Sequence, residues 1–132
     1  MAGVTPADEP ERPDGEDLPV DGPETAAEQR LLASFGRRAR TVNLGRVLRL
    51  LELLDASDEG RLDERGRGEA ENLAHQVVGS AGTFGYPAAS ADAAVIEGYF
   101  ALARRGGSGA DAPVVRRTLD RLRALFEDPA QR

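Results

Sequence analysis

Apolar residues recur at helical spacing along most of this chain, and this spacing constrains the fold more than any other feature. In the segment from about residue 37 to residue 56, three- and four-residue intervals connect Leu44, Val47, Leu48, Leu51 and Leu54. No long stretch alternates apolar and polar residues, and no hairpin dipeptide joins two such stretches. Aromatic residues make up only 5% of the chain, so the core must be built from Leu, Val and Ala. The sequence therefore predicts an all-α fold.

Glycine, proline and polar residues divide this pattern into five helical segments. A short helix is expected after Pro23, with a break or bend at Gly36. Its apolar face would be formed by Leu31, Leu32 and Phe35. Four longer helices are expected at about residues 37–56, 62–84, 88–105 and 111–129. Because the loops are only a few residues long, the predicted architecture is an antiparallel four-helix bundle with a short extra N-terminal helix.

The first residues differ in composition from the rest of the chain. Residues 1–22 hold four of the eight prolines, and residues 1–24 carry eight carboxylates against one arginine, a local net charge of −7. Such a segment buries too little apolar surface to offset the entropy lost on ordering. We therefore expect a disordered, acidic, proline-rich tail over residues 1–22. Residues 23–129 would form the bundle, which is nearly neutral because the whole chain carries −6.

Several functional classes are excluded by what the sequence lacks. Cysteine is absent and histidine occurs once, which excludes disulfides, thiolate sites and multi-histidine metal centres. We expect neither a metal nor a cofactor. There is no basic stripe with interleaved aromatic residues, so no nucleic-acid partner is expected. No run of about 18 apolar residues and no signal peptide is present, so a cytoplasmic protein without a membrane association is expected.

The only histidine, His75, lies among glycines in the segment 62–84. On a helical wheel, an arc of about 100° holds Ala70, Leu73, Ala74, Val77, Ala81 and Phe84, the expected core face. His75 lies about 160° from the centre of this arc and should project into solvent. Gly68, Gly79 and Gly82 fall within roughly 40° of the histidine. The sequence thus predicts a convex face, cleared of side chains, around His75.

Glycines at such positions weaken a helix, by about 1 kcal/mol each relative to alanine. They are useful where another molecule must approach the backbone closely, although tight helix–helix packing is an alternative explanation. An exposed neutral imidazole is a nucleophile that can accept a phosphoryl group on a ring nitrogen. A lone histidine builds no catalytic pocket, so the metal ion and the charge stabilisation would come from the partner. An ordinary surface histidine is the alternative.

The segment from His75 to Gly85 resembles the signature of histidine-containing phosphotransfer (HPt) domains. The matching residues are Ala74, His75, Gly79, Ser80, Ala81, Phe84 and Gly85, with Val77 in place of a leucine. Downstream, the segment Ala94–Glu97 resembles part of the family's following helix. The resemblance covers about residues 24–127. It implies a four-helix bundle whose histidine exchanges a phosphoryl group with the aspartate of a response-regulator receiver domain.

One position departs from the family pattern. Three residues after the histidine, where the family usually has a lysine that helps to neutralise the phosphoryl group, this chain has Val78. Substitute positive charge could come from Arg46, Arg49 or Arg67. The residues expected to meet the partner are Gly68, Glu71, Val78, Gly79 and Gly82, around the phosphoryl acceptor His75.

The sequence thus predicts a monomeric histidine phosphotransfer protein of a two-component phosphorelay, with a receiver domain and a hybrid histidine kinase as partners. It would be a phosphoryl carrier and not an enzyme, since no phosphate-binding glycine loop precedes a helix. The alternative is a phosphorylation-independent, HPt-like module that docks and occludes a receiver or a histidine kinase. In that case Val78, which replaces the family's lysine, would indicate that the module has lost phosphoryl transfer. A further option is a substrate domain of a separate chemotaxis-type kinase.

Overall fold

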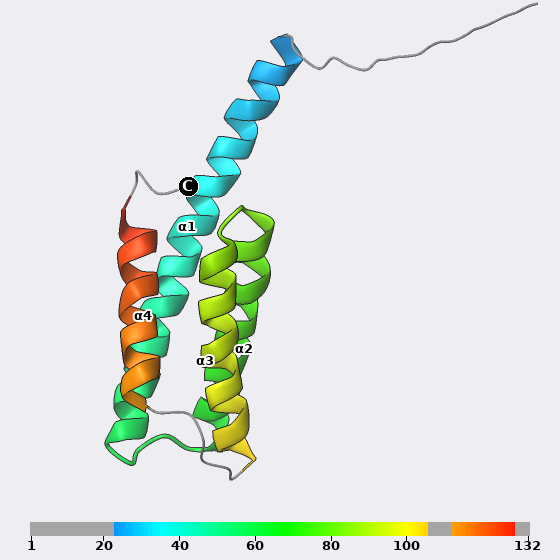
Figure 1. Cartoon of the computed structure of the whole chain (residues 1–132). Helices are drawn as coiled ribbons and strands as arrows, with labels where there is room; N and C mark the ends of the chain where they lie inside the picture. The colour runs from blue at the N-terminus through cyan, green and yellow to red at the C-terminus, as the bar shows by residue number, and fades with distance from the viewer. Residues whose placement is uncertain (1–22, 106–111, 129–132) are drawn as a thin grey trace, which may run out of the picture. The chain divides into compact units, whose positions relative to one another are not determined.

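The computed structural model describes residues 23–105 and 112–128, and these residues form four helices (Figure 1). The helices are α1 (Pro23–Asp58), α2 (Glu64–Thr83), α3 (Pro87–Arg104) and α4 (Ala112–Glu127). No strand occurs in the described part of the chain. The all-α prediction is therefore confirmed. The predicted disordered tail, residues 1–22, lies outside the described residues.

The separate short N-terminal helix is not shown, because α1 continues without a break through Gly36. A glycine inside a helix costs about 1 kcal/mol relative to alanine, which weakens the helix but does not end it. By their contacts, residues 1–36 and 37–132 form two units. Within the first unit the described residues are helical, and Leu31 and Leu32 are exposed.

Within residues 37–132, side chains from all four helices form one apolar core. The buried members are Val47, Leu50, Leu53 and Leu54 of α1, Ala70, Ala74, Val77 and Ala81 of α2, Ala89, Ala93, Ile96 and Phe100 of α3, and Val115, Leu119, Leu122 and Phe126 of α4. This is the packing of a four-helix bundle. One expectation for α1 was wrong, since Leu48 is exposed.

The ends of α2 follow from local chemistry. Asp63 is the N-cap, and its Oδ1 accepts a hydrogen bond of 2.8 Å from the backbone N–H of Gly66. At the other end, the backbone N–H of Phe84 bonds to the carbonyl of Ser80, and Gly85 adopts a positive φ of 87°. Pro87 then begins α3. This short turn sets α2 and α3 side by side and antiparallel (Figure 1).

Arginine–carboxylate pairs bridge each pair of neighbouring helices within residues 37–132. Arg49 contacts Glu69 between α1 and α2, with Nε to Oε2 at 2.7 Å. The other bridges are Arg104–Glu71 between α2 and α3, Arg121–Asp92 between α3 and α4, and Arg116 with Asp55 and Asp58 between α4 and α1. These pairs connect the four helices at the surface of the bundle. None of the described helices has the length and apolar character needed to cross a membrane.

Candidate functional site

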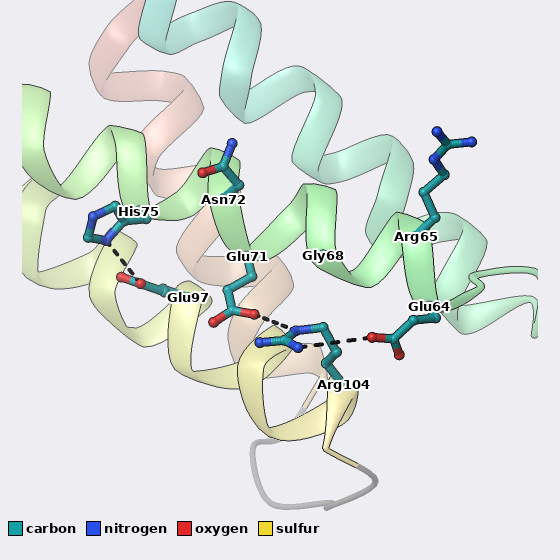
Figure 2. A pocket seen from close by; sticks show the side chains of 8 residues that line it. All are labelled: Glu64, Arg65, Gly68, Glu71, Asn72, His75, Glu97 and Arg104. Atoms are coloured by element: carbon teal, nitrogen blue, oxygen red, sulfur yellow. Dashed lines mark hydrogen bonds and ion pairs between the residues drawn. The ribbon is translucent and has the colours of Figure 1, made fainter.

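His75 projects from the middle of α2, and its side chain is 70% exposed. Its Nδ1 lies 3.0 Å from Oε2 of Glu97 on α3 (Figure 2). A carboxylate only accepts hydrogen bonds, so Nδ1 carries the hydrogen and donates it to Glu97. The other ring nitrogen, Nε2, then holds a lone pair. The arrangement therefore fixes one tautomer of an exposed imidazole.

The glycines near His75 leave open space beside the helix. A Cβ atom built on Gly68 or Gly79 meets nothing within 4 Å, and one on Gly82 comes only to 3.6 Å from Oγ of Ser90. Gly79 and Gly82 are exposed, and Gly68 is half-buried. The alternative explanation, tight helix–helix packing, therefore finds no support at Gly68 and Gly79, whereas Gly82 lies close to Ser90 of α3. Their absent side chains leave the backbone of α2 accessible next to the histidine.

His75 also borders a depression between α2 and α3, with a cavity volume of about 610 Å³. Its lining consists of Glu64, Arg65, Gly68, Glu71, Asn72, His75, Glu97 and Arg104 (Figure 2). The expectation of a purely convex face was therefore wrong. The side chains of α3 rise beside α2 and turn this part of the surface into a shallow, charged groove.

Glu71 lies one turn before His75 and is held by Arg104 of α3. The Oε1 atom of Glu71 accepts a hydrogen bond of 2.7 Å from Nε of Arg104, whose guanidinium also lies 4.0 Å from Glu64. The hydrogen bond from Arg104, together with the positive charges of Arg104 and Arg105, lowers the pKa of the Glu71 carboxyl below its ordinary value. Glu71 is therefore ionised at neutral pH.

Val78 is half-buried and packs against the core. Its side chain is apolar and brings no charge to the site. The arginines that the sequence suggested as substitutes do not line the depression. Arg46 donates to Oδ1 of Asn43, and Arg49 binds Glu69 on the α1–α2 boundary. Arg67 donates to the backbone carbonyl of Leu62.

A buried polar contact between α1 and α2 holds α2 in place on the side away from His75. Asn43 of α1 is only 2% exposed, and its Nδ2 donates a hydrogen bond of 3.0 Å to Oγ of Ser80, five residues beyond His75. Arg46 completes this contact by donating to Asn43 Oδ1 at 2.8 Å. Because these groups are satisfied only in one register, they set the position of α2 relative to α1.

Glu97 and Arg104 were not identified as site residues from the sequence. Glu97 was named only as part of a family resemblance. The signal that could have identified them is the short turn around Gly85. In an antiparallel hairpin, residues at similar distances before and after the turn face each other, which brings Glu97 to His75 and Arg104 to Glu71.

The chemistry of the site is that of a single nucleophile. Among the described residues, no three His, Asp or Glu side chains are grouped so that they could hold a metal ion. The site therefore offers an exposed imidazole with a defined tautomer, beside a depression lined by three carboxylates and two arginines.

Comparison with known proteins gave one match. The family model described as the Hpt domain matches residues 30–128, which is most of the chain and all of the site. No curated protein and no solved structure matches the chain.

Proposed function

The chain belongs to the Hpt domain family, and we propose that it carries a phosphoryl group on His75 to or from the aspartate of a response-regulator receiver domain. Members of this family are histidine phosphotransfer modules that carry phosphate and are not themselves catalysts. The partners we propose are a receiver domain and a hybrid histidine kinase in a two-component phosphorelay. We further propose that the protein acts as a monomer in the cytoplasm.

The observation that carries this proposal is the state of the His75 ring. The side chain is 70% exposed, and Nδ1 is engaged by Glu97 at 3.0 Å. Nε2 is thus the nitrogen whose lone pair faces an incoming donor. In-line attack needs the donor oxygen, the phosphorus and the nitrogen to align, so a partner must come very close.

The transfer step conserves atoms and charge with these groups alone. The Nε2 lone pair forms the new N–P bond while the O–P bond of the partner's aspartyl phosphate breaks, and the aspartate oxygen leaves with the electron pair. The ring keeps its hydrogen on Nδ1, and the Glu97 carboxylate balances the positive charge of the imidazolium. In the reverse direction the N–P bond breaks, and the neutral imidazole leaves with the electron pair on Nε2.

We propose that the partner docks on the face around His75 through Gly68, Glu71, Val78, Gly79 and Gly82. The open space above Gly79 supports a close approach, since no atom beyond the helix itself lies within 4 Å of where its Cβ would be. The half-buried Val78 would offer an apolar contact to the partner. The metal ion and the charges that catalyse transfer would belong to the partner.

A phosphotransfer assay tests this function. Receiver domains charged with labelled phosphate should pass the label to the wild-type protein, and His75→Gln should abolish labelling. Label on histidine can be assigned to His75 because the chain has no second histidine. Equal labelling of the His75→Gln protein would contradict the proposal. If the wild type stays unlabelled but binds a receiver as tightly as His75→Gln does, the protein is instead a phosphorylation-independent module that occludes its partner.

A further inference from the structure

One carboxylate separates the His75 imidazole from the guanidinium of Arg104. Glu71 precedes His75 by one turn of α2, and it accepts the 2.7 Å hydrogen bond from Arg104 Nε. All three side chains line the same depression (Figure 2). In this state, without a phosphoryl group on His75, the charge of Arg104 is neutralised by Glu71.

A phosphoryl group on His75 would lie close to two negatively charged carboxylates. Glu97 contacts the ring at 3.0 Å, and Glu71 lies one turn away. A phosphoryl group itself carries a charge of about −1.5 to −2 at pH 7. Repulsion between these like charges raises the energy of the phosphorylated state unless a cation moves in. Val78, in the position where the family has a lysine, cannot supply one.

Arg104 is the best-placed cation for this task. The cations lining the depression are Arg65 and Arg104. Arg65 lies ten residues before His75 on the same helix, which is about 15 Å along the axis. Arg104 already reaches Glu71, only about one helical pitch of 5.4 Å from the level of His75. A guanidinium also binds phosphoryl oxygens through paired hydrogen bonds, which makes it a strong partner for them.

We propose that Arg104 neutralises the phosphoryl group on His75 and that Glu71 holds Arg104 in place until phosphorylation occurs. This inference rests on the proposed function and deepens it. On phosphorylation the guanidinium exchanges the Glu71 carboxylate for the phosphoryl oxygens, with no change in covalent bonds. The positive charge that the family pattern places on the histidine helix comes here from α3, so Arg104 and Glu71 together set the stability of the phosphohistidine.

Chemical phosphorylation tests this role without any partner protein. With phosphoramidate as donor, Nε2 of His75 forms the new N–P bond while the N–P bond of the donor breaks. The donor nitrogen is already protonated in the phosphoramidate zwitterion, so neutral ammonia leaves with the electron pair. Phosphorus NMR as a function of pH then follows the pKa of the phosphoryl group. The charged groups around it are Glu64, Arg65, Glu71, Glu97 and Arg104.

We expect opposite effects from the two halves of the pair. Arg104→Gln should raise the phosphoryl pKa by about 1, because the dianion loses its cation. Glu71→Gln should lower it, because Arg104 no longer has a competing carboxylate. Arg104→Lys should retain most of the wild-type value. The matched control is Arg121→Gln, which breaks the comparable α3–α4 pair with Asp92 and should leave the phosphoryl pKa unchanged.

Equal phosphoryl pKa values in the wild type, Arg104→Gln and Glu71→Gln would overturn the proposal. A lowered melting temperature in Arg104→Gln with an unchanged phosphoryl pKa would also overturn it, since the pair would then be purely structural. The outcome is separate from the receiver assay. Transfer without the pKa changes refutes the role of Arg104 alone, whereas the pKa changes without transfer refute only the receiver function. Failure of phosphoramidate to label His75 would overturn both.

Discussion

The two nitrogens of one imidazole have different surroundings, and the proposed chemistry depends on this difference. Nδ1 of His75 faces Glu97 at 3.0 Å, while the ring as a whole is largely exposed. Glu97 does not touch the transferred group in this arrangement and acts through the ring, so it is a positioning residue. Its contribution is to keep the hydrogen on Nδ1 and the lone pair on Nε2.

Replacement of Glu97 should therefore be visible in the ring itself. We expect Glu97→Ala to reduce the share of the Nδ1–H tautomer and to slow phosphorylation by phosphoramidate by about fivefold, the effect of losing one partly exposed hydrogen bond to a charge. Glu97→Gln should restore part of the tautomer preference, since the amide oxygen still accepts. Nitrogen NMR of the single histidine measures the tautomer. An unchanged tautomer population in Glu97→Ala would refute the positioning role, and Asp92→Ala on the same helix is the control.

At the scale of helices, the sequence predicted what local chemistry determines and missed what depends on contacts between elements. The starts and ends of α2 and α3 agree with expectation to within a few residues, because Asp63, Gly85 and Pro87 give caps and turns of known type. The expected break at Gly36 is not seen, because one glycine does not outweigh the helix on both sides of it. The pairing of Glu97 with His75 depends on the register between two helices, which residue spacing within one helix does not contain.

The glycines of α2 allow a matched test of helix stability against docking. Gly79→Ala should raise the free energy of unfolding by about 1 kcal/mol, because the added methyl group meets no neighbour and alanine favours the helix. The same change should slow transfer from a receiver domain. Gly45→Ala in α1 is the control, since Gly45 is equally open. It should give the same gain in urea unfolding with unchanged transfer. Unchanged transfer in Gly79→Ala as well would argue against close docking at this glycine.

At the scale of the residue 37–132 unit, the arginine–carboxylate pairs between helices make stability depend on pH. Hydrogen bonds from Arg49 and Arg104 lower the carboxyl pKa values of Glu69 and Glu71 from the ordinary 4.5. A carboxyl group with a lowered pKa in the folded state stabilises the fold above its ordinary pKa. This stabilisation is lost as the pH falls through the lowered value.

Urea unfolding should therefore become easier from about pH 5 downward. The double variant Glu69→Gln/Glu71→Gln should be less stable than the wild type at pH 7 and should show a flatter loss of stability toward low pH. Parallel curves for the wild type and the double variant would show that these two pairs do not contribute. High salt should weaken the wild type at pH 7 in the same direction, because the pairs are partly exposed.

The short turn between α2 and α3 has a consequence for how the site forms during folding. The contacts that build the site, His75–Glu97 and Glu71–Arg104, join residues only 22 and 33 positions apart, within one helical hairpin. Contacts between residues close in sequence require little loop-closure entropy and form quickly. We therefore expect the hairpin to assemble the imidazole with its carboxylate before α4 completes the core. The site would then form within the α2–α3 hairpin alone. Packing of α1 and α4 would stabilise it after it has formed.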